Sequence, residues 1–396
     1  MVSSGRRRSG SARRAAFWGV LAALLLLAAC TLLNPLDDYT NGIRSDAGLE
    51  ASLDVRSDAS IDAGCALRIP PERPTAGEGS GPLLRFAFDS MQPDRDGGPL
   101  GYDLDRQCTC QGGPTSCLNK AAPTAPACDL PEGVDNAGGA LYKAIAAQAK
   151  SIAKYDIDPS GPIQRGRATL ILQLADWNGT PNDSNVVLGL LYSFGTDGSQ
   201  DAGDGFWSPE AGTIPPKRDG NDVWTYDPDS LPGGVPRIED RAAYVRDGVL
   251  VGRFSSMALA LGAVRFVIQD VIITGKLVPF AQGGTQLVDG VIQGRDSAED
   301  ILTQFQMFRS PNPPFDNLCR DEPIYAALRD NVCKELDIRK APGDDNKGLP
   351  CDAVSLAFAY TAIPAKLGPP FPAPIQPTPC DDPDAGAAGK WVGRCP

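Results

Sequence analysis

The sequence predicts a mainly β fold of the β-sandwich or jelly-roll kind, with a few helices and several disulfide bonds. Short apolar segments rich in β-branched and aromatic residues alternate with turns rich in Gly, Pro and Asp. The chain also contains 11 cysteines, which is a high number for 396 residues. The first and last apolar segments lie next to cysteine clusters, and jelly-roll sandwiches often place their terminal strands side by side. An α+β fold is the alternative.

Predicted strands dominate a globular region that spans residues 81–367. Most segments are identified by their apolar content, and one pair is marked by Asp247-Gly248, the strongest short hairpin signal in the chain. We also expect two or three strands between residues 257 and 278. The other predicted strands are residues 83–89, 168–175, 186–194, 244–245, 249–254, 287–292 and 353–361.

Three helices are predicted within the same region. Residues 139–152 place leucine and isoleucine on one face of a helix and alanine elsewhere. Residues 297–307 follow Asp296, which we expect to cap the helix, with Glu299 placed for a reciprocal bond. A third helix is expected at residues 323–336, with Asp321 as its cap.

The first 29 residues have the composition of a signal peptide. Five arginines precede an apolar run, which ends at Leu27-Ala28-Ala29-Cys30. This ending resembles the lipobox of bacterial lipoproteins. The resemblance implies cleavage before Cys30, lipidation of its thiol with diacylglycerol, and a further fatty acyl chain such as palmitate on the new amino terminus. An uncleaved membrane anchor over residues 15–33 is the alternative.

The resemblance also predicts a location in the cell envelope. In Gram-negative lipoproteins, retention in the inner membrane usually depends on an aspartate after the lipidated cysteine, and this chain has Thr31 there. We therefore expect an outer-membrane lipoprotein. Residues 30–80 are rich in Asp, Ser, Ala and Gly and are predicted to be the lipid anchor and a disordered acidic tether. Residues 368–396 form a proline-rich tail that we expect a disulfide to hold, with Cys380–Cys395 as one option.

The remaining ten cysteines predict disulfide bonds, because an exported chain folds in an oxidising compartment. Five lie early in the chain and five late, so complete pairing requires at least one bridge between the two groups. Zinc binding by the early group is the rival interpretation. The candidates are Cys65, Cys108, Cys110, Cys117, Cys128, Cys319, Cys333, Cys351, Cys380 and Cys395.

Composition excludes several functions. The chain has no histidine, which rules out Ser-His-Asp and Cys-His catalysis and histidine-ligated metals. Loss of residues 1–29 removes five arginines and no acid, which leaves 32 basic and 49 acidic residues and a formal charge of −17. A field of that sign repels nucleic acid and anionic headgroups, so we expect no nucleic-acid partner.

An acidic segment predicts a calcium site. Asp94, Asp96, Asp103 and Asp105 alternate with other residues beside glycines, and calcium prefers six to eight oxygen ligands. The EF-hand pattern is not met, and a solvated acidic loop is the alternative. Residues 197–205 form a second, more glycine-rich acidic segment. No other cofactor is expected.

Aromatic residues near polar turns predict a ligand site. Trp177, Asn178, Trp207 and Trp224 combine ring surfaces with hydrogen-bonding side chains, which carbohydrate sites require. The alternative is that these tryptophans pack in the core.

These observations together predict a lipid-anchored exported protein with a non-catalytic binding or structural role, whose partner is carbohydrate or another envelope protein. Residues 101–110 (GYDLDRQCTC), with Asp222-Val-Trp224 and Cys351-Asp-Ala353, resemble uncharacterised exported lipoproteins of Gram-negative bacteria. That resemblance implies a location and no activity. A histidine-free hydrolase of the glycosidase kind, which uses paired carboxylates, is the alternative function.

Overall fold

The computed structural model describes residues 66–77, 79–93, 98–123, 127–143, 160–196, 214–261, 264–307, 322–373 and 395. Within these ranges no helix is long and apolar enough to cross a membrane. The predicted signal peptide, Cys30 and most of the predicted tether lie outside the described residues.

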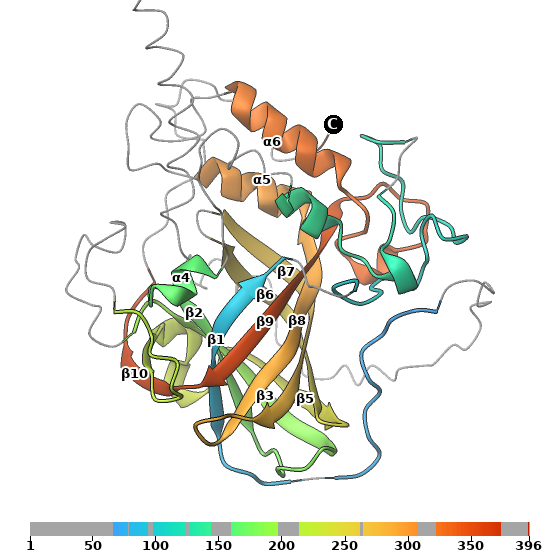
Figure 1. Ribbon diagram of the computed structural model, residues 1–396. Coiled ribbons are helices and arrows are strands. Elements are labelled where there is room, and N and C mark those ends of the chain that lie inside the picture. Colours follow the sequence, from blue (N-terminus) through green and yellow to red (C-terminus); the bar gives the residue numbers. More distant parts are fainter. Residues whose placement is uncertain are drawn as a thin grey trace, which may run out of the picture.

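Eight antiparallel strands form a closed barrel (Figure 1) in the order β1-β2-β3-β5-β6-β7-β8-β9. Apart from the excursion to β4, strands that are consecutive in the chain are neighbours in the barrel. The barrel strands are β1 (Leu84–Gln92), β2 (Thr169–Ala175), β3 (Asp183–Ser193), β5 (Ile238–Arg246), β6 (Val249–Leu261), β7 (Val264–Pro279), β8 (Thr285–Ser297) and β9 (Ala353–Pro364).

The predicted β-sandwich is therefore wrong, although the mainly β content is correct. β1 pairs with β2 through Phe86 and Leu172, and it also pairs with β9 through Ala87 and Ile363. The last strand thus closes the sheet on the first. Alternation of apolar residues is the same in a sandwich and in a small barrel, so the local pattern does not reveal this closure.

Two hairpins join neighbouring barrel strands, and one of them is at the predicted Asp247-Gly248 turn. β2 and β3 pair from Thr169–Ser193 to Ala175–Val187. β5 and β6 are joined by Asp247 and Gly248, whose φ angles of 51° and 81° are those of a type I′ turn. Residues 257–278 contain the end of β6 and nearly all of the 16-residue β7, rather than a set of shorter strands.

The barrel interior is filled with apolar side chains. Phe88 and Tyr360 stack with ring centroids 4.3 Å apart, and Tyr142 packs edge-on against Phe358. Leu172 and Leu188 belong to the same core and are fully buried. This packed core agrees with the small diameter of an eight-stranded barrel, whose interior side chains fill the available space.

A second, two-stranded sheet covers part of the outer barrel wall. It pairs β4 (Val223–Tyr226) with β10 (Lys366–Pro370) in parallel. Trp224 packs there against Ala87, Ile171 and Leu191, which are outward residues of β1, β2 and β3. These three strands are consequently buried on both faces.

Two helices lie across one end of the barrel (Figure 1), namely α5 (Ala298–Met307) and α6 (Glu322–Lys334). Both fall close to the predicted ranges. The cap of α5 is Ser297 rather than Asp296: its hydroxyl accepts from the Asp300 N–H at 3.1 Å and donates to the Asp300 carboxylate. Asp321 lies outside the described residues.

The remaining helical segments are short. Residues 137–143 are helical and fall partly within the predicted 139–152, whose later part lies outside the described residues. The others are α4 (Gly161–Gln164) and the 3₁₀ turns η2 (Pro131–Gly133), η3 (Pro228–Ser230), η4 (Pro232–Gly234) and η6 (Pro342–Asp344).

Three disulfides join described cysteines: Cys110–Cys128, Cys117–Cys351 and Cys333–Cys395. Cys117–Cys351 links the early and late groups, as parity requires. Cys395 pairs with Cys333, so the suggested Cys380–Cys395 clip is wrong, but a disulfide does hold the tail. Cys108 is also disulfide-bonded. Cys65, Cys319 and Cys380 lie outside the described residues.

Candidate functional site

The candidate site lies in a cysteine-rich layer on the outer wall of β8 and β9. We call this layer the cap and define it as residues 98–123, 127–136 and 335–352. Two fully buried side chains of β8 hold it. Gln293 donates to the carbonyls of Tyr102 and Asp135 at 2.8 and 2.7 Å, and Arg295 donates to the Leu104 carbonyl at 2.8 Å. The barrel wall thus positions the two cap segments that carry the site.

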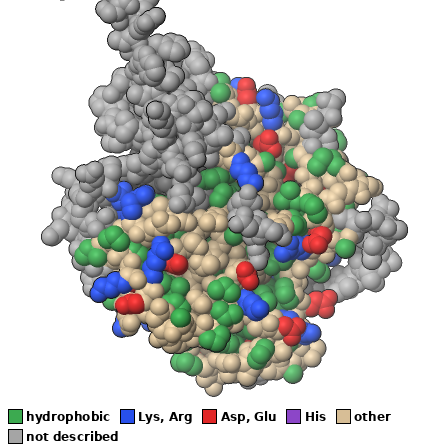
Figure 2. Space-filling model, in the orientation of Figure 1, with side chains coloured by type: hydrophobic (Ala, Val, Ile, Leu, Met, Phe, Trp, Pro, Cys, Tyr) green, Lys and Arg blue, Asp and Glu red, His purple; other side chains and the backbone are tan. Residues whose placement is uncertain are grey.

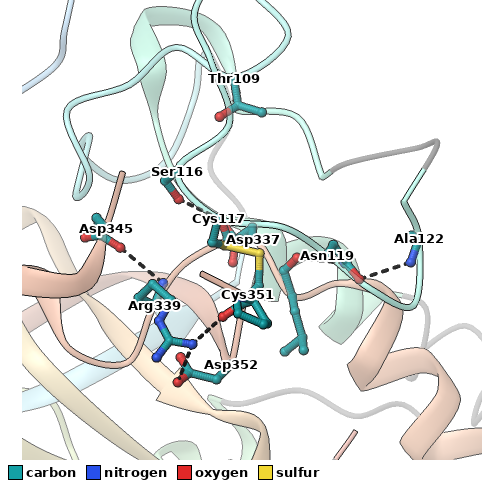
Figure 3. The surroundings of a disulfide bond; sticks show 12 residues. Thr109, Ser116, Cys117, Asn119, Ala122, Asp337, Arg339, Asp345, Cys351 and Asp352 are labelled. Carbon is teal, nitrogen blue, oxygen red and sulfur yellow. Dashed lines mark hydrogen bonds and ion pairs between the residues drawn. A yellow bond between two sulfur atoms is a disulfide. The ribbon is translucent and has the colours of Figure 1, made fainter. Parts of the chain in front are cut away.

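A disulfide joins the two halves of the cap, and an arginine braces the later half (Figure 3). Cys117 and Cys351 are bonded across 234 residues of sequence. Beside them, Arg339 forms an ion pair with Asp352 at 2.8 Å, and its N–H donates to Asp345 at 3.2 Å. The two halves are therefore joined by a covalent bond, and main-chain hydrogen bonds such as Leu118 N–H to the Leu349 carbonyl at 2.9 Å reinforce the link.

The amino-terminal described segment, residues 66–77, runs from the cap to the opposite part of the barrel, and we call it the strap. Near the cap, the Arg68 N–H donates to the Glu132 carbonyl at 2.9 Å and the Arg68 carbonyl accepts from the Asp103 N–H at 2.8 Å. Farther along, the Arg73 guanidinium lies 4.9 Å from the centre of the Tyr244 ring and donates to the Ser184 carbonyl at 2.8 Å. The strap thus connects the cap to β3 and β5.

Three aspartates meet inside the cap. One carboxylate oxygen from each of Asp103, Asp105 and Asp135 lies within 4.8 Å of the other two. Asp103 and Asp105 are each 5% exposed, and Asp135 is 1% exposed. We call these residues the carboxylate triad.

Main-chain N–H groups orient each carboxylate of the triad. Asp103 Oδ1 accepts from the Arg106 N–H, and Asp105 Oδ1 accepts from the Gln107 N–H at 2.7 Å. Asp135 Oδ2 accepts from the Leu104 N–H at 2.6 Å. One oxygen of each group is therefore fixed by the backbone. The other oxygens of Asp103 (Oδ2) and Asp135 (Oδ1) are buried and accept no hydrogen bond, although the Asp103 carboxyl group, when protonated, can share its proton with Asp105.

Two more aspartates of the cap are partly buried. Asp129 accepts from the Thr109 N–H, and Asp337 accepts from the Ser355 N–H at 2.8 Å. Burial, with a smaller contribution from the negative charge of Asp105, raises the pKa of Asp129 to about 8 and that of Asp337 to about 7. The cap thus encloses several carboxyl groups that resist ionisation.

The same effects act on the triad itself. Burial, followed by the charge of Asp105, raises the pKa of Asp103 to about 7. Burial and the charge of Asp105 also raise the pKa of Asp135 well above its usual value. Two neighbouring carboxylates in a low-dielectric site are stable only when a proton or a cation reduces their charge.

The buried arginine that contacts the loop of the triad is already paired with other acids. Arg295 is fully buried and forms ion pairs with Asp345 at 2.8 Å and Asp270 at 3.5 Å. Within the described parts of the chain, no lysine or arginine forms an ion pair with a member of the triad. The protein itself therefore leaves the charge of the triad uncompensated.

The structure brings two of the four predicted calcium residues together, and they are Asp103 and Asp105. Asp94 and Asp96 lie outside the described residues, as does the second acidic segment, residues 197–205. Sequence reasoning missed Asp135, which stands alone between Val134 and Asn136 with no acidic neighbour. Only tertiary structure brings it beside a motif 30 residues earlier.

The predicted aromatic site does not form as a unit. Trp224 is 2% exposed and belongs to the core under β4, so its ring has no face available to a sugar. Trp177 is half-buried and donates to the Thr180 carbonyl at 3.0 Å, and Asn178 uses its amide within the same turn. Trp177 lies before the start of β3. Trp224 forms a β-bridge with Thr196, which lies after the end of β3, so the length of that strand separates the two tryptophans. Trp207 lies outside the described residues.

Comparison with protein-family models, curated proteins and solved structures finds no match to this chain.

Proposed function

We propose that the mature chain is an exported, lipid-anchored protein of the cell envelope with a non-catalytic structural or binding role. The observation that carries this proposal is the construction of the cap, which disulfides and buried polar contacts fasten to the wall of a fully packed barrel. Disulfides of this kind form and persist in oxidising compartments, which supports export. The lipobox-like sequence before Cys30 supplies the anchor.

The burial of the candidate site favours a binding or structural role over the alternative hydrolase. A glycosidase needs two carboxyl groups that flank a bound sugar, one on each side of the scissile bond. The carboxylate triad is at most 5% exposed, so a sugar ring has no access to it. The carboxylates of the triad face one another inside the cap and not a surface at which a substrate binds.

The proposal includes no nucleic-acid partner, because the mature chain carries a formal charge of −17. On the face shown in Figure 2, lysine and arginine side chains are interspersed with aspartate and glutamate and do not form a basic stripe. Nucleic-acid binding requires such a stripe or patch to neutralise phosphates. Another envelope protein, or the envelope itself, therefore remains the proposed partner.

Cys30→Ser tests the anchor directly. Cells that express the full chain are labelled with a palmitate analogue, and the expected result is complete loss of label together with retention of residues 1–29. The double variant Cys110→Ser/Cys128→Ser removes a disulfide but should keep the label. Labelling that persists in Cys30→Ser contradicts the proposal.

Thr31→Asp tests the location within the envelope. If the chain is sorted as a lipoprotein, this change should move it from the outer to the inner membrane fraction, with Thr31→Ser as the matched control. An unchanged distribution contradicts the outer-membrane assignment.

A further inference from the structure

We propose that Asp103, Asp105 and Asp135 form a binding site for one calcium ion inside the cap. This goes beyond the proposed function, which requires an anchor and a stable cap but no metal. It also differs from the site expected on residues 94–105, because Asp135 comes from a different segment. The proposal stands on the positions of the oxygens, the lack of hydrogen bonds to two of them, the pairing of nearby charges, and the chemistry of the donors.

The spacing of the carboxylate oxygens suits a single cation. Calcium binds oxygen at 2.3–2.6 Å, so two ligands of one ion lie at most about 5 Å apart. The three oxygens of the triad lie within 4.8 Å of one another. They come from both cap segments held by β8, since Gln293 binds the carbonyls of Tyr102 and Asp135.

The hydrogen-bond pattern leaves two oxygens available for a ligand. In Asp103 and Asp135, one oxygen accepts a main-chain hydrogen bond and the other accepts none, although both residues are more than nine-tenths buried. A buried polar atom without a partner is costly, and a buried charge without one more so. A cation between these oxygens supplies the missing partner for both.

Among the described residues, no lysine or arginine forms an ion pair with the triad. The buried Arg295 donates to the Leu104 carbonyl between two members of the triad, but its charge is paired with Asp345 and Asp270. It therefore fixes the loop that carries Asp103 and Asp105 without neutralising them. A divalent ion neutralises the charge that remains.

The donor atoms favour calcium over transition metals. All three ligands are carboxylate oxygens, and the chain has no histidine. The nearby Cys108 and Cys110 are disulfide-bonded, so they provide no thiolate for zinc or copper. Hard cations prefer carboxylates, and calcium accepts irregular geometry more readily than magnesium, which demands a near-octahedral shell.

Calcium titration of the full mature chain, purified in detergent and freed of metal with EDTA, tests the proposal. Calorimetry should show one calcium ion per chain and weaker binding of magnesium. Calcium at about a hundred times its dissociation constant should raise the midpoint of thermal unfolding by several degrees. The proposal would be overturned if neither ion bound and the unfolding midpoint were the same in EDTA and in calcium. Preferential binding of magnesium would also overturn it.

Asp135→Asn separates a metal ligand from a structural hydrogen-bond acceptor. Removal of one buried negative charge should lower calcium affinity at least about tenfold, and in EDTA it should leave the unfolding midpoint equal to or above that of the unchanged chain. A purely structural role predicts the opposite, an equal loss of stability in EDTA and in calcium. Asp103→Asn should reproduce the first pattern if Asp135→Asn fails to fold.

Asp247→Asn is the matched control. Asp247 lies in the exposed β5–β6 turn with a positive φ angle, which asparagine also adopts readily. This variant should bind calcium with unchanged affinity. Loss of binding in Asp247→Asn, or full binding in both triad variants, would overturn the assignment.

Discussion

The barrel interior and the cap are stabilised in different ways, although they lie on opposite sides of the same two strands. Inside, Phe358 and its apolar neighbours exclude water and require no external component. Outside, β8 and β9 support a layer rich in carboxylates, disulfides and buried ion pairs. The comparison teaches that one sheet can combine an apolar core on one face with a layer held by disulfides and buried ion pairs on the other.

Phe358→Ala should produce the largest loss and act on the interior alone. Phe358 is fully buried and packs against Tyr142, so its truncation leaves a cavity that costs about 3–5 kcal/mol of unfolding free energy. Denaturant unfolding should show the same loss in EDTA and in calcium. A loss that depends strongly on calcium would mean that the stability of the interior is coupled to that of the cap.

Removal of the Cys117–Cys351 disulfide should produce the next largest effect. The double variant Cys117→Ala/Cys351→Ala opens a link across 234 residues and should cost about 2–5 kcal/mol. Because this link holds the cap, calcium affinity should fall as well. The control Cys110→Ala/Cys128→Ala opens a loop of only 18 residues and should cost less stability.

The pH dependence of stability should distinguish the cap from the interior. Burial raises the pKa of Asp103 and Asp337 to about 7 and that of Asp129 to about 8 in the folded chain, above their value near 4 when unfolded. These carboxyl groups therefore bind protons more tightly in the folded chain than in the unfolded chain. In EDTA, their contribution to the free energy of unfolding is greatest below pH 4 and is lost as the pH rises to about 8. Calcium should flatten this fall. An equally steep fall in calcium would show that the ion does not reach these carboxyls.

Ser297→Ala should have the smallest effect, at the helical end of the barrel. Loss of the cap of α5 should reduce the unfolding free energy by about 1 kcal/mol. The reduction should not depend on calcium, since the Ser297 hydroxyl bonds to Asp300 and to no member of the triad. Thermal unfolding with and without EDTA checks this, and Asp296→Asn, a change at the residue first expected to be the cap, provides a comparison.

Much of the barrel was predictable because its signals are local. The segment at residues 83–89 and the Asp247-Gly248 turn identify β1 and the β5–β6 hairpin from a few residues each. Closure of the sheet was not predictable, since it depends on pairing between Ala87 and Ile363 at opposite ends of the chain. An open sandwich and a closed barrel bury the same alternating residues, so the sequence pattern does not distinguish them.

The candidate site was predictable only in part, for the same reason. Asp103 and Asp105 form a recognisable D-x-D motif, whereas Asp135 is an isolated acid whose position is set by Gln293 and by the contacts of the cap. Trp224 shows the converse case, because its sequence surroundings suggest a ligand site while β4 places it in the core. Local composition alone does not distinguish an exposed ring from a buried one.

The strap also determines how the domain responds to mechanical force. The main chain of Arg68 is bonded to Glu132 on one side and to Asp103 on the other. If the chain is anchored through Cys30, tension that passes along the strap meets these bonds before it reaches any barrel strand. The carboxylate triad then lies in the path of the load, and an ion bound there would raise the force that the domain withstands before the cap separates from the barrel.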